Sequence, residues 1–280
     1  MRSGILDDVI ARALAEDLGS GDVTTEATIP ADLEVVADVV VKSPGVVCGI
    51  PELLACIRAL DPEAELELLA DEGTVVEAPP QTVARIRARA QAVLSAERTG
   101  LNLIQRMSGI ATATRTYVRA VEGTGAEILD TRKTAPGLRR LDKRAVAAGG
   151  GTNHRMGLSD AILIKDNHVA LAGGIVPAVE AARAANPGLA VEVEVDDLAQ
   201  LDEALGAHAD TILLDNMEPA LLRRAVARTG GRARLEASGG ITLDTVRAVA
   251  ETGVDAISVG ALTHSVTALD VSLEVHPWQS

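Results

Sequence analysis

The chain has 280 residues, 47% of them hydrophobic, and so is long enough for one large core or two unequal ones. Its formal net charge is −14, which disfavours nucleic acid and anionic membranes as partners. No apolar run approaches the roughly 20 residues of a membrane span.

The N-terminal segment has the period of an amphipathic helix over residues 4–18. It carries Asp7, Asp8 and Glu16 instead of the basic flank and apolar core of a secretion signal. We therefore expect a cytoplasmic protein.

Residues 1–108 show no regular alternation of strand and helix. The segments LEVVADVVV, AELELLA and TVARIRA predict strands, and helical patterns occur at 4–18, 51–60 and 91–107. Cys48 and Cys56 fit neither a disulfide framework nor a zinc-ligand spacing, so we expect buried thiols. This part of the sequence predicts a small α+β, sandwich-like domain, to which the alternating segment ALDVSLEV in 266–280 returns as an extra strand.

From Ala126 onward, a short apolar run that ends in a polar or glycine residue recurs. The runs are AEILD, AILIKD, VEVEV, TILLDN, RLEAS and AISVG. Amphipathic, helix-length segments separate most of them, at 177–185, 197–205, 219–229 and 243–252. Strand alternating with helix indicates parallel strands joined by crossovers. We therefore predict that 109–265 forms an incomplete α/β barrel with a six-stranded core, which makes the protein α/β in class.

Polar residues collect where these predicted strands end, and active sites of such barrels lie at that rim. The loops ASGGI and SVGALTH are typical of a phosphate site, in which backbone N–H groups and a helix N-terminus face the anion. The expected phosphate-binding residues are Ser238, Gly239, Gly240, Gly260 and Ala261. The glycines could instead serve only tight strand-to-helix turns.

The acidity of the chain has a local exception in the window 131–165. Eight cationic residues stand there against Asp142 and Asp160, a net +6 in a chain of −14. The cations are Arg132, Lys133, Arg139, Arg140, Lys143, Arg144, Arg155 and Lys165. Such a window indicates a pocket for a small, highly charged anion, or a basic helix face that pairs with surface acids.

The longest dense block, DTRKTAPGLRRLDKRAVAAGGGTNHRMGLSDAILIKDNH, closely resembles the core of the quinolinate phosphoribosyltransferase family. The likeness extends in family order through ALAEDLGSGDVTTE, AERTGLNLIQRMSGIATAT, VEVEV, LLDNM, LEASGGI and SVGALTHS. The chain departs from the family pattern at Gly100, Ala135 and Arg144, where Ala, Thr and an aromatic residue are common. None of these departures removes a charged site residue.

The resemblance implies a decarboxylating transfer between quinolinate and phosphoribosyl pyrophosphate. Arg132, His154 and Arg155 would hold the quinolinate carboxylates, because arginine forks suit planar carboxylates. Thr131 would also contact substrate, and Lys133 and Lys165 would lie near the reacting groups as catalytic residues. Each of these residues could otherwise be a plain surface charge or hydroxyl.

The family also implies a cofactor and an assembly. Glu194 and Asp215 would act in catalysis by binding the ribose hydroxyls and magnesium, directly or through water, and no organic cofactor is needed. They could instead be salt-bridge partners of the cations. Arg98 would reach the active site of the partner subunit in a homodimer, with a higher oligomer possible, or else be an exposed helix arginine.

Three other functions stay open at this point. Lys165 could form a Schiff base in an aldolase-type barrel, although the arginine cluster would then have no role. The protein could be a non-catalytic anion-binding barrel, which the retention of Glu194 and Asp215 disfavours. A sibling phosphoribosyltransferase for another aromatic acid is the nearest alternative, since arginine pockets tolerate related diacids.

Overall fold

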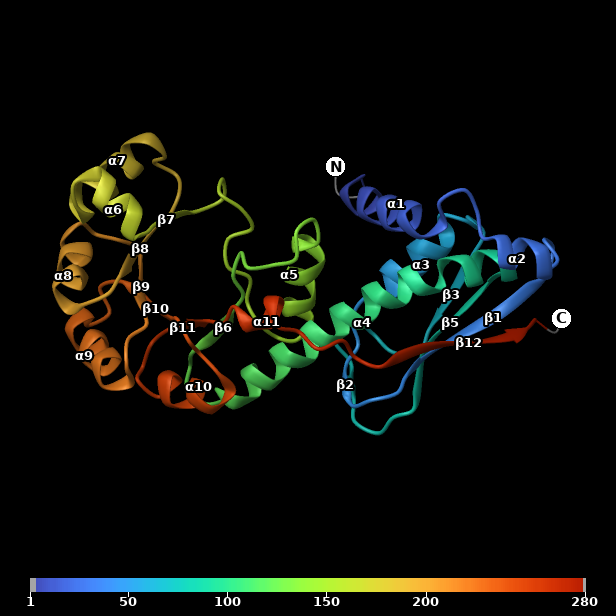
Figure 1. The fold of residues 1–280 in the computed structure, drawn as a ribbon. Helices are drawn as coiled ribbons and strands as arrows, with labels where there is room; N and C mark the ends of the chain where they lie inside the picture. The colour runs from blue at the N-terminus through green and yellow to red at the C-terminus, as the bar shows by residue number, and fades with distance from the viewer. Residues whose placement is uncertain (1–3, 279–280) are drawn as a thin grey trace. The chain divides into compact units, whose positions relative to one another are not determined.

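The computed structural model describes residues 4–278, and the chain divides into two compact units (Figure 1). Unit 1 consists of the described residues up to Ala113, together with Ala135–Gly150 and the segment from Val266 onward. Unit 2 consists of Thr114–Thr134 and Gly151–Ser265. The first boundary between the units therefore falls inside one long helix, α4 (Ala90–Ala120).

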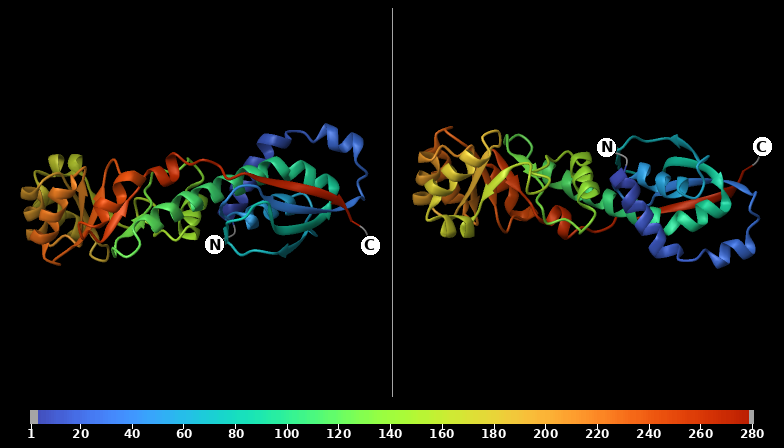
Figure 2. Two further views of the ribbon diagram at one scale, coloured as in Figure 1. Left: turned by 90° about the horizontal axis from the view of Figure 1, so that it is seen from below. Right: turned by 90° about the horizontal axis from the view of Figure 1, so that it is seen from above.

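Unit 1 contains an antiparallel four-stranded sheet in the order β12-β1-β5-β3. Its strands are β1 (Glu34–Val41), β3 (Glu65–Leu68), β5 (Gln81–Arg89) and β12 (Val271–Pro277). Side chains alternate along β1, and Val35, Ala37, Val39 and Val41 are buried on one face. The last strand of the chain pairs with the first, and both views of Figure 2 show β12 beside β1. Strands β2 (Gly45–Val46) and β4 (Val75–Val76) form a separate short pair.

The helices of unit 1 besides α4 are α1 (Gly4–Leu18), α2 (Val23–Thr28), α3 (Ile50–Arg58) and α5 (Arg139–Ala148). The Asp22 carboxylate caps α2 by accepting the N–H of Thr25. The Glu72 carboxylate does the same for α3, accepting the N–H groups of Gly49 and Ile50 at 2.9–3.0 Å. Cys48 and Cys56 are buried as free thiols, as the sequence predicts.

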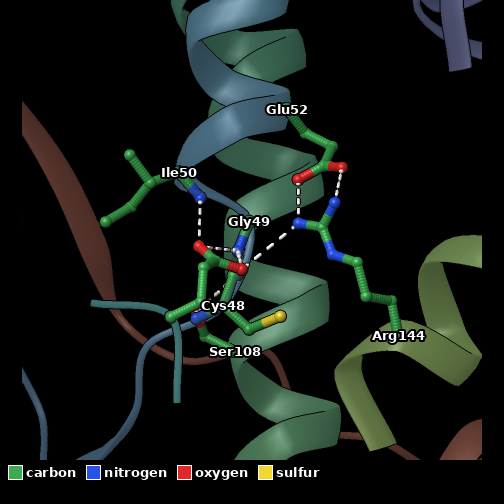
Figure 3. Close-up of polar contacts among 7 residues, drawn as sticks. Cys48, Gly49, Ile50, Glu52, Ser108 and Arg144 are labelled. Carbon is green, nitrogen blue, oxygen red and sulfur yellow. Dashed lines mark hydrogen bonds and ion pairs between the residues drawn. The ribbon is translucent and has the colours of Figure 1, made fainter. Parts of the chain in front are cut away.

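Helix α5 belongs to unit 1, whereas the domain bounds expected from the sequence place it in the barrel segment. Two buried ion pairs account for its place. Asp142, which is fully buried, accepts two hydrogen bonds from the Arg106 guanidinium of α4 at 2.8–2.9 Å. Arg144 forms a bidentate pair with Glu52 of α3 (Figure 3). The same guanidinium also donates to Glu72. The basic pattern of α5 thus serves packing within unit 1.

Unit 2 contains six parallel strands in the order β6-β11-β10-β9-β8-β7. They are β6 (Glu127–Leu129), β7 (Ile162–Ile164), β8 (Val191–Val195), β9 (Thr211–Asp215), β10 (Arg234–Ser238) and β11 (Ala256–Ser258). The central strands β8, β9 and β10 are mostly buried along their length, as expected of parallel strands covered on both faces, although β8 and β10 carry glutamates. Over residues 4–278, β6 and β7 end the strand order without pairing to each other. The predicted incomplete barrel with a six-stranded core is confirmed.

The helices of unit 2 follow the strands and cover the sheet (Figure 1). They are α6 (Asp166–Ala172), α7 (Ile175–Ala185), α8 (Leu198–Gly206), α9 (Pro219–Thr229), α10 (Leu243–Ala250) and the one-turn α11 (Ala261–His264). The four helices expected from amphipathic patterns are α7 to α10. Helices α6 and α11 were not predicted, because each lies inside a polar motif that hides its period. Among the described residues, no helix has both the length and the apolar content to cross a bilayer.

Candidate active site

Unit 2 holds a pocket of about 750 Å³ at the carboxyl ends of its six strands. Each strand contributes at its end, from Thr131 after β6 to Gly260 after β11. The lining is Thr131, Arg132, Lys133, His154, Arg155, Leu163, Lys165, Glu194, Leu213, Asp215, Asn216, Glu236, Ser238, Gly239, Gly240, Ile241, Thr242, Ser258, Val259, Gly260, Ala261 and His264. This is the edge at which parallel barrels carry their active sites.

Four cationic side chains face three carboxyl groups in this pocket. Burial and the nearby positive charge of Arg132 lower the pKa of Arg155 below that of a free guanidinium. Arg155 also donates a hydrogen bond to the backbone carbonyl of Ala161 at 3.2 Å. Because two guanidinium groups repel each other here, an anion bound between them would relieve that repulsion.

The carboxylates of the rim lie on neighbouring strands. Glu194 near the end of β8 forms an ion pair with Lys165, which follows β7. Asp215 ends β9 and accepts a hydrogen bond from the side-chain amide of Asn216. Asn216 has a positive φ of 53°, and its backbone N–H donates to Ser238 at the end of β10. Polar contacts at the rim therefore join β7 to β8 and β9 to β10.

Glu194 and Asp215 fit the ligand preferences of a magnesium ion. Both are carboxylates that line the same pocket from adjacent, paired strands. Magnesium favours one or two carboxylates completed by phosphate oxygens and water. The ion pair with Lys165 already neutralises part of the negative charge of Glu194 before any metal binds.

The glycine loop after β10 approaches other backbone closely. Gly239 has φ +92°, and a Cβ at this position would lie 2.2 Å from Oδ1 and 3.0 Å from the backbone nitrogen of Asn216. Gly240 also has a positive φ, +60°. At the other loop, the Thr263 hydroxyl donates to the backbone carbonyl of Lys133 at 2.8 Å, which anchors the segment that carries Arg132 and Lys133. Glycine at position 239 is thus required by backbone geometry and by space.

Substitution of Gly239 with alanine is expected to weaken binding of the phosphorylated substrate. The Cβ would force the loop away from Asn216, and the positive φ adds strain, so we expect KM for the phosphorylated substrate that the sequence resemblance implies to rise about tenfold or more. Steady-state kinetics with that substrate varied measures the effect. Gly188→Ala is the matched control, because no atom lies within 4 Å of its added Cβ. Equal KM values for both variants would contradict this role for the loop.

Below the rim, three titratable side chains meet inside unit 2. The Nε2 atom of His154 lies 3.0 Å from a Glu192 oxygen and 3.6 Å from a Glu236 oxygen. Burial and the neighbouring charge of Glu192 raise the pKa of Glu236 to about 7. A carboxyl group with that pKa is about half protonated at neutral pH, and its protonated form can donate a hydrogen bond.

The structure brings the barrel residues proposed from the sequence into this one pocket and leaves Arg98 outside it. Arg98 is exposed on α4 in unit 1. The sequence did not lead us to Glu236 and His264, which also line the pocket. The sequence did contain an indication of each residue. Glu236 is a charged residue in the middle of the predicted strand RLEAS, and His264 follows Gly260 by four residues, about one helical turn. The roles proposed for all of these residues remain predictions.

A pocket with four cationic side chains, glycine loops and two rim carboxylates, at the carboxyl ends of parallel strands, is typical of an α/β-barrel enzyme. The chain belongs to the quinolinate phosphoribosyl transferase family. The N-terminal domain of that family matches residues 22–108 and its C-terminal domain matches residues 110–274. The resemblance seen in the sequence motifs is thereby confirmed.

Individual relatives agree with this assignment. The chain is 48% identical over 275 residues to the nicotinate-nucleotide pyrophosphorylase (carboxylating) of Mycobacterium leprae, with 96% of each chain covered. It is 43% identical over 290 residues to quinolinate phosphoribosyltransferase (decarboxylating) 1b of Nicotiana tabacum, covering 96% of this chain and 82% of the other. The structure of the nicotinate-nucleotide pyrophosphorylase from Francisella tularensis matches with a TM-score of 0.94 at 38% identity, covering 99% and 98% of the two chains.

Proposed function

We propose that this protein is a quinolinate phosphoribosyltransferase of NAD biosynthesis, which converts quinolinate and phosphoribosyl pyrophosphate into nicotinate mononucleotide, pyrophosphate and carbon dioxide. The observation that carries the proposal is the pocket of unit 2, in which Arg132 and Arg155 lie close enough to lower the pKa of Arg155. A planar diacid offers one carboxylate to each guanidinium, and such charge-assisted bonds are stronger than neutral ones.

The reaction has two stages. In the first, the ring nitrogen of quinolinate forms a bond to the anomeric carbon while the bond from that carbon to pyrophosphate breaks. In the second, the bond between the ring and the carboxylate next to nitrogen breaks. Its electron pair stays on the ring carbon beside the pyridinium nitrogen, and a proton then adds to that carbon. Positioning and electrostatics supply most of the acceleration in a reaction of this kind.

Each group of pocket residues has a proposed part in these stages. Arg132 and Arg155 orient the diacid, with Thr131 and His154 beside them, and the loops at Ser238–Gly240 and Gly260–Ala261 hold the phosphate of the ribose. Glu194 and Asp215 bind the ribose hydroxyls and hold magnesium. Bound magnesium would neutralise charge on the departing pyrophosphate. Lys165 holds Glu194 in place through their ion pair. Lys133, whose backbone Thr263 anchors, is our candidate for the proton donor. No organic cofactor enters this scheme.

Turnover of the purified protein tests the function. Incubation with quinolinate, phosphoribosyl pyrophosphate and magnesium should release carbon dioxide and form nicotinate mononucleotide in equal amounts. Nicotinate offered in place of quinolinate should give no product, because it lacks the second carboxylate. Consumption of nicotinate alone would refute the substrate assignment.

We also propose a homodimer in which Arg98 completes the partner's pocket. Its exposure on α4 and its position in the AERTGLN motif support this proposal. Cytoplasmic localisation, and the absence of nucleic-acid and membrane partners, stay predictions of the sequence.

Mixing two impaired variants tests the shared site. Arg98→Ala and Arg155→Ala should each be impaired alone, because each dimer lacks one arginine in both of its pockets. A hybrid dimer regains one complete pocket, so random exchange of subunits should restore about a quarter of wild-type activity. Activity after denaturing and refolding the mixture is the measurement. No recovery, with dimers present in solution, would place Arg98 in the pocket of its own chain or outside any pocket.

A further inference from the structure

Two glutamates inside the barrel of unit 2 have no part in the scheme above. Glu192 lies two residues before Glu194 on β8, on the same side of the strand but one step deeper, and Glu236 is the central residue of β10. Their side chains are among the buried charged groups, at 8% and 2% exposure. Each also has one carboxylate oxygen without a hydrogen-bond partner in the described structure. Buried charged groups with unsatisfied oxygens lower the stability of the fold, so a functional role is the natural explanation for them.

Both glutamates meet His154, and His154 is fixed at three points. Its backbone N–H donates to the fully buried Asp130 at 2.9 Å. Its Nδ1 atom accepts the backbone N–H of Arg155 at 2.6 Å. Its Nε2 atom lies 3.0 Å from Glu192. The imidazole ring therefore stands between a buried carboxylate and the backbone of a diacid-binding arginine.

The hydrogen bonds define the tautomer of this histidine. A ring nitrogen that accepts an N–H group has its lone pair free, so Nδ1 carries no proton. The proton must then lie on Nε2, where it faces the carboxylate of Glu192. We propose that Glu192 is a positioning residue for the quinolinate end of the pocket: its carboxylate holds the Nε2–H tautomer of His154, and Nδ1 thereby fixes the backbone of Arg155. This inference rests on the proposed function only for the identity of the diacid.

The second glutamate completes the arrangement. Burial and the charge of Glu192 raise the pKa of Glu236 to about 7, so both protonation states of this carboxyl are populated near neutral pH. The protonated form of Glu236 avoids the repulsion of two buried carboxylates. Glu192 is the nearer of the two acceptors to Nε2 of His154, at 3.0 Å against 3.6 Å.

The same three side chains could ligate a metal ion by spacing alone, since their ligand atoms lie within 4.8 Å of one another. The hydrogen bond at Nδ1 argues against that role. It leaves the proton of a neutral imidazole on Nε2, and a protonated nitrogen has no lone pair for a metal. Histidine ligands usually have the reverse arrangement, in which the second ring nitrogen donates its proton to a neighbour. The geometry thus favours orientation of the ring.

The tautomer can be read directly from nitrogen-15 chemical shifts of the ring. The chain has five histidines, and the His154 signals are those lost in a His154→Gln variant. In the wild-type protein at neutral pH, we expect a protonated Nε2 and an unprotonated Nδ1 for this residue. A wild-type ring protonated at Nδ1 would overturn the proposal, whether or not the enzyme turns over quinolinate.

Steady-state kinetics of a Glu192→Gln variant test whether Glu192 affects substrate binding. The amide removes the charge and offers Nε2 a donor as well as an acceptor, so the Nε2–H tautomer is no longer enforced and the bond from the Arg155 N–H to Nδ1 is weakened. We expect KM for quinolinate to rise about tenfold while KM for phosphoribosyl pyrophosphate stays within about twofold. Glu236→Gln should have a smaller effect, because glutamine mimics a neutral carboxyl. Glu180→Gln, an exposed residue of α7, is the matched control.

The outcomes separate the possible roles. A selective rise in KM for quinolinate together with the changed tautomer supports positioning. Equal loss for both substrates with a lowered melting temperature would mean that Glu192 is only structural and would overturn the proposal. If the wild-type protein does not turn over quinolinate at all, the proposed function fails, and the nitrogen-15 signals still test the tautomer.

Discussion

Replacing Arg155 with alanine is expected to raise KM for quinolinate about a hundredfold or more, with a much smaller change in KM for phosphoribosyl pyrophosphate. Arg155 is partly buried, lies near Arg132, and donates to Ala161, so its guanidinium is held in the pocket before the substrate arrives. Removing one partner of a buried, hydrogen-bonded charge pair typically costs 2 to 5 kcal/mol, which is roughly 30-fold to several thousandfold in affinity. Initial-rate kinetics over a range of both substrates measures the split.

Two further variants make this result specific. Arg155→Lys keeps the charge but loses the planar fork, so we expect it to lie between wild type and the alanine variant. Arg224→Ala, on the exposed face of α9, removes a positive charge outside the pocket and should leave the kinetics unchanged. An equal effect at positions 155 and 224 would mean that only the net charge matters.

Replacing Arg144 with alanine should lower the free energy of unfolding by about 3 kcal/mol, because it leaves the buried carboxylate of Glu52 without its partner. Figure 3 shows the arginine of α5 directed at Glu52 of α3, and the same guanidinium reaches Glu72 at 3.2 Å. Denaturant unfolding measures the loss. Arg85→Ala, which removes a partly exposed arginine that pairs with Asp38 and Glu67, should cost about 1 kcal/mol or less.

The loss at position 144 should depend on pH. Burial raises the pKa of Glu52 even with Arg144 present, and removing the arginine raises it further. A carboxyl with a raised pKa in the folded state binds its proton more tightly there than in the unfolded chain, so its burial becomes less costly as pH falls. The difference between Arg144→Ala and wild type should therefore be smaller near pH 5 than near pH 8. A difference that grows on acidification would exclude Glu52 as the cause.

The sequence predicted the barrel because its strands are short apolar runs that end in polar or glycine residues. VEVEV and TILLD became β8 and β9, and the residues at their ends reached one pocket. The place of α5 was not predictable, since the partners that hold it, Glu52 and Arg106, lie tens of residues away in the chain. A pattern of basic residues cannot show whether they face a ligand or a buried acid.

The inner glutamates illustrate a second limit. Glu192 and Glu194 are equivalent in the alternation of VEVEV, and only the depth of the barrel separates a rim carboxylate from a buried one. The contact of Glu192 with His154 joins strand β8 to the loop after β6, two segments that are distant in the strand order of the sheet. Local sequence patterns contain no information on such a meeting of distant segments.

The most direct test is a crystal structure of the protein with quinolinate bound. The diacid should occupy the rim pocket of unit 2, with its carboxylates against Arg132 and Arg155 and its ring nitrogen open toward the side of Glu194 and Asp215. Quinolinate found elsewhere, or the two guanidinium groups turned away from it toward solvent, would contradict the account.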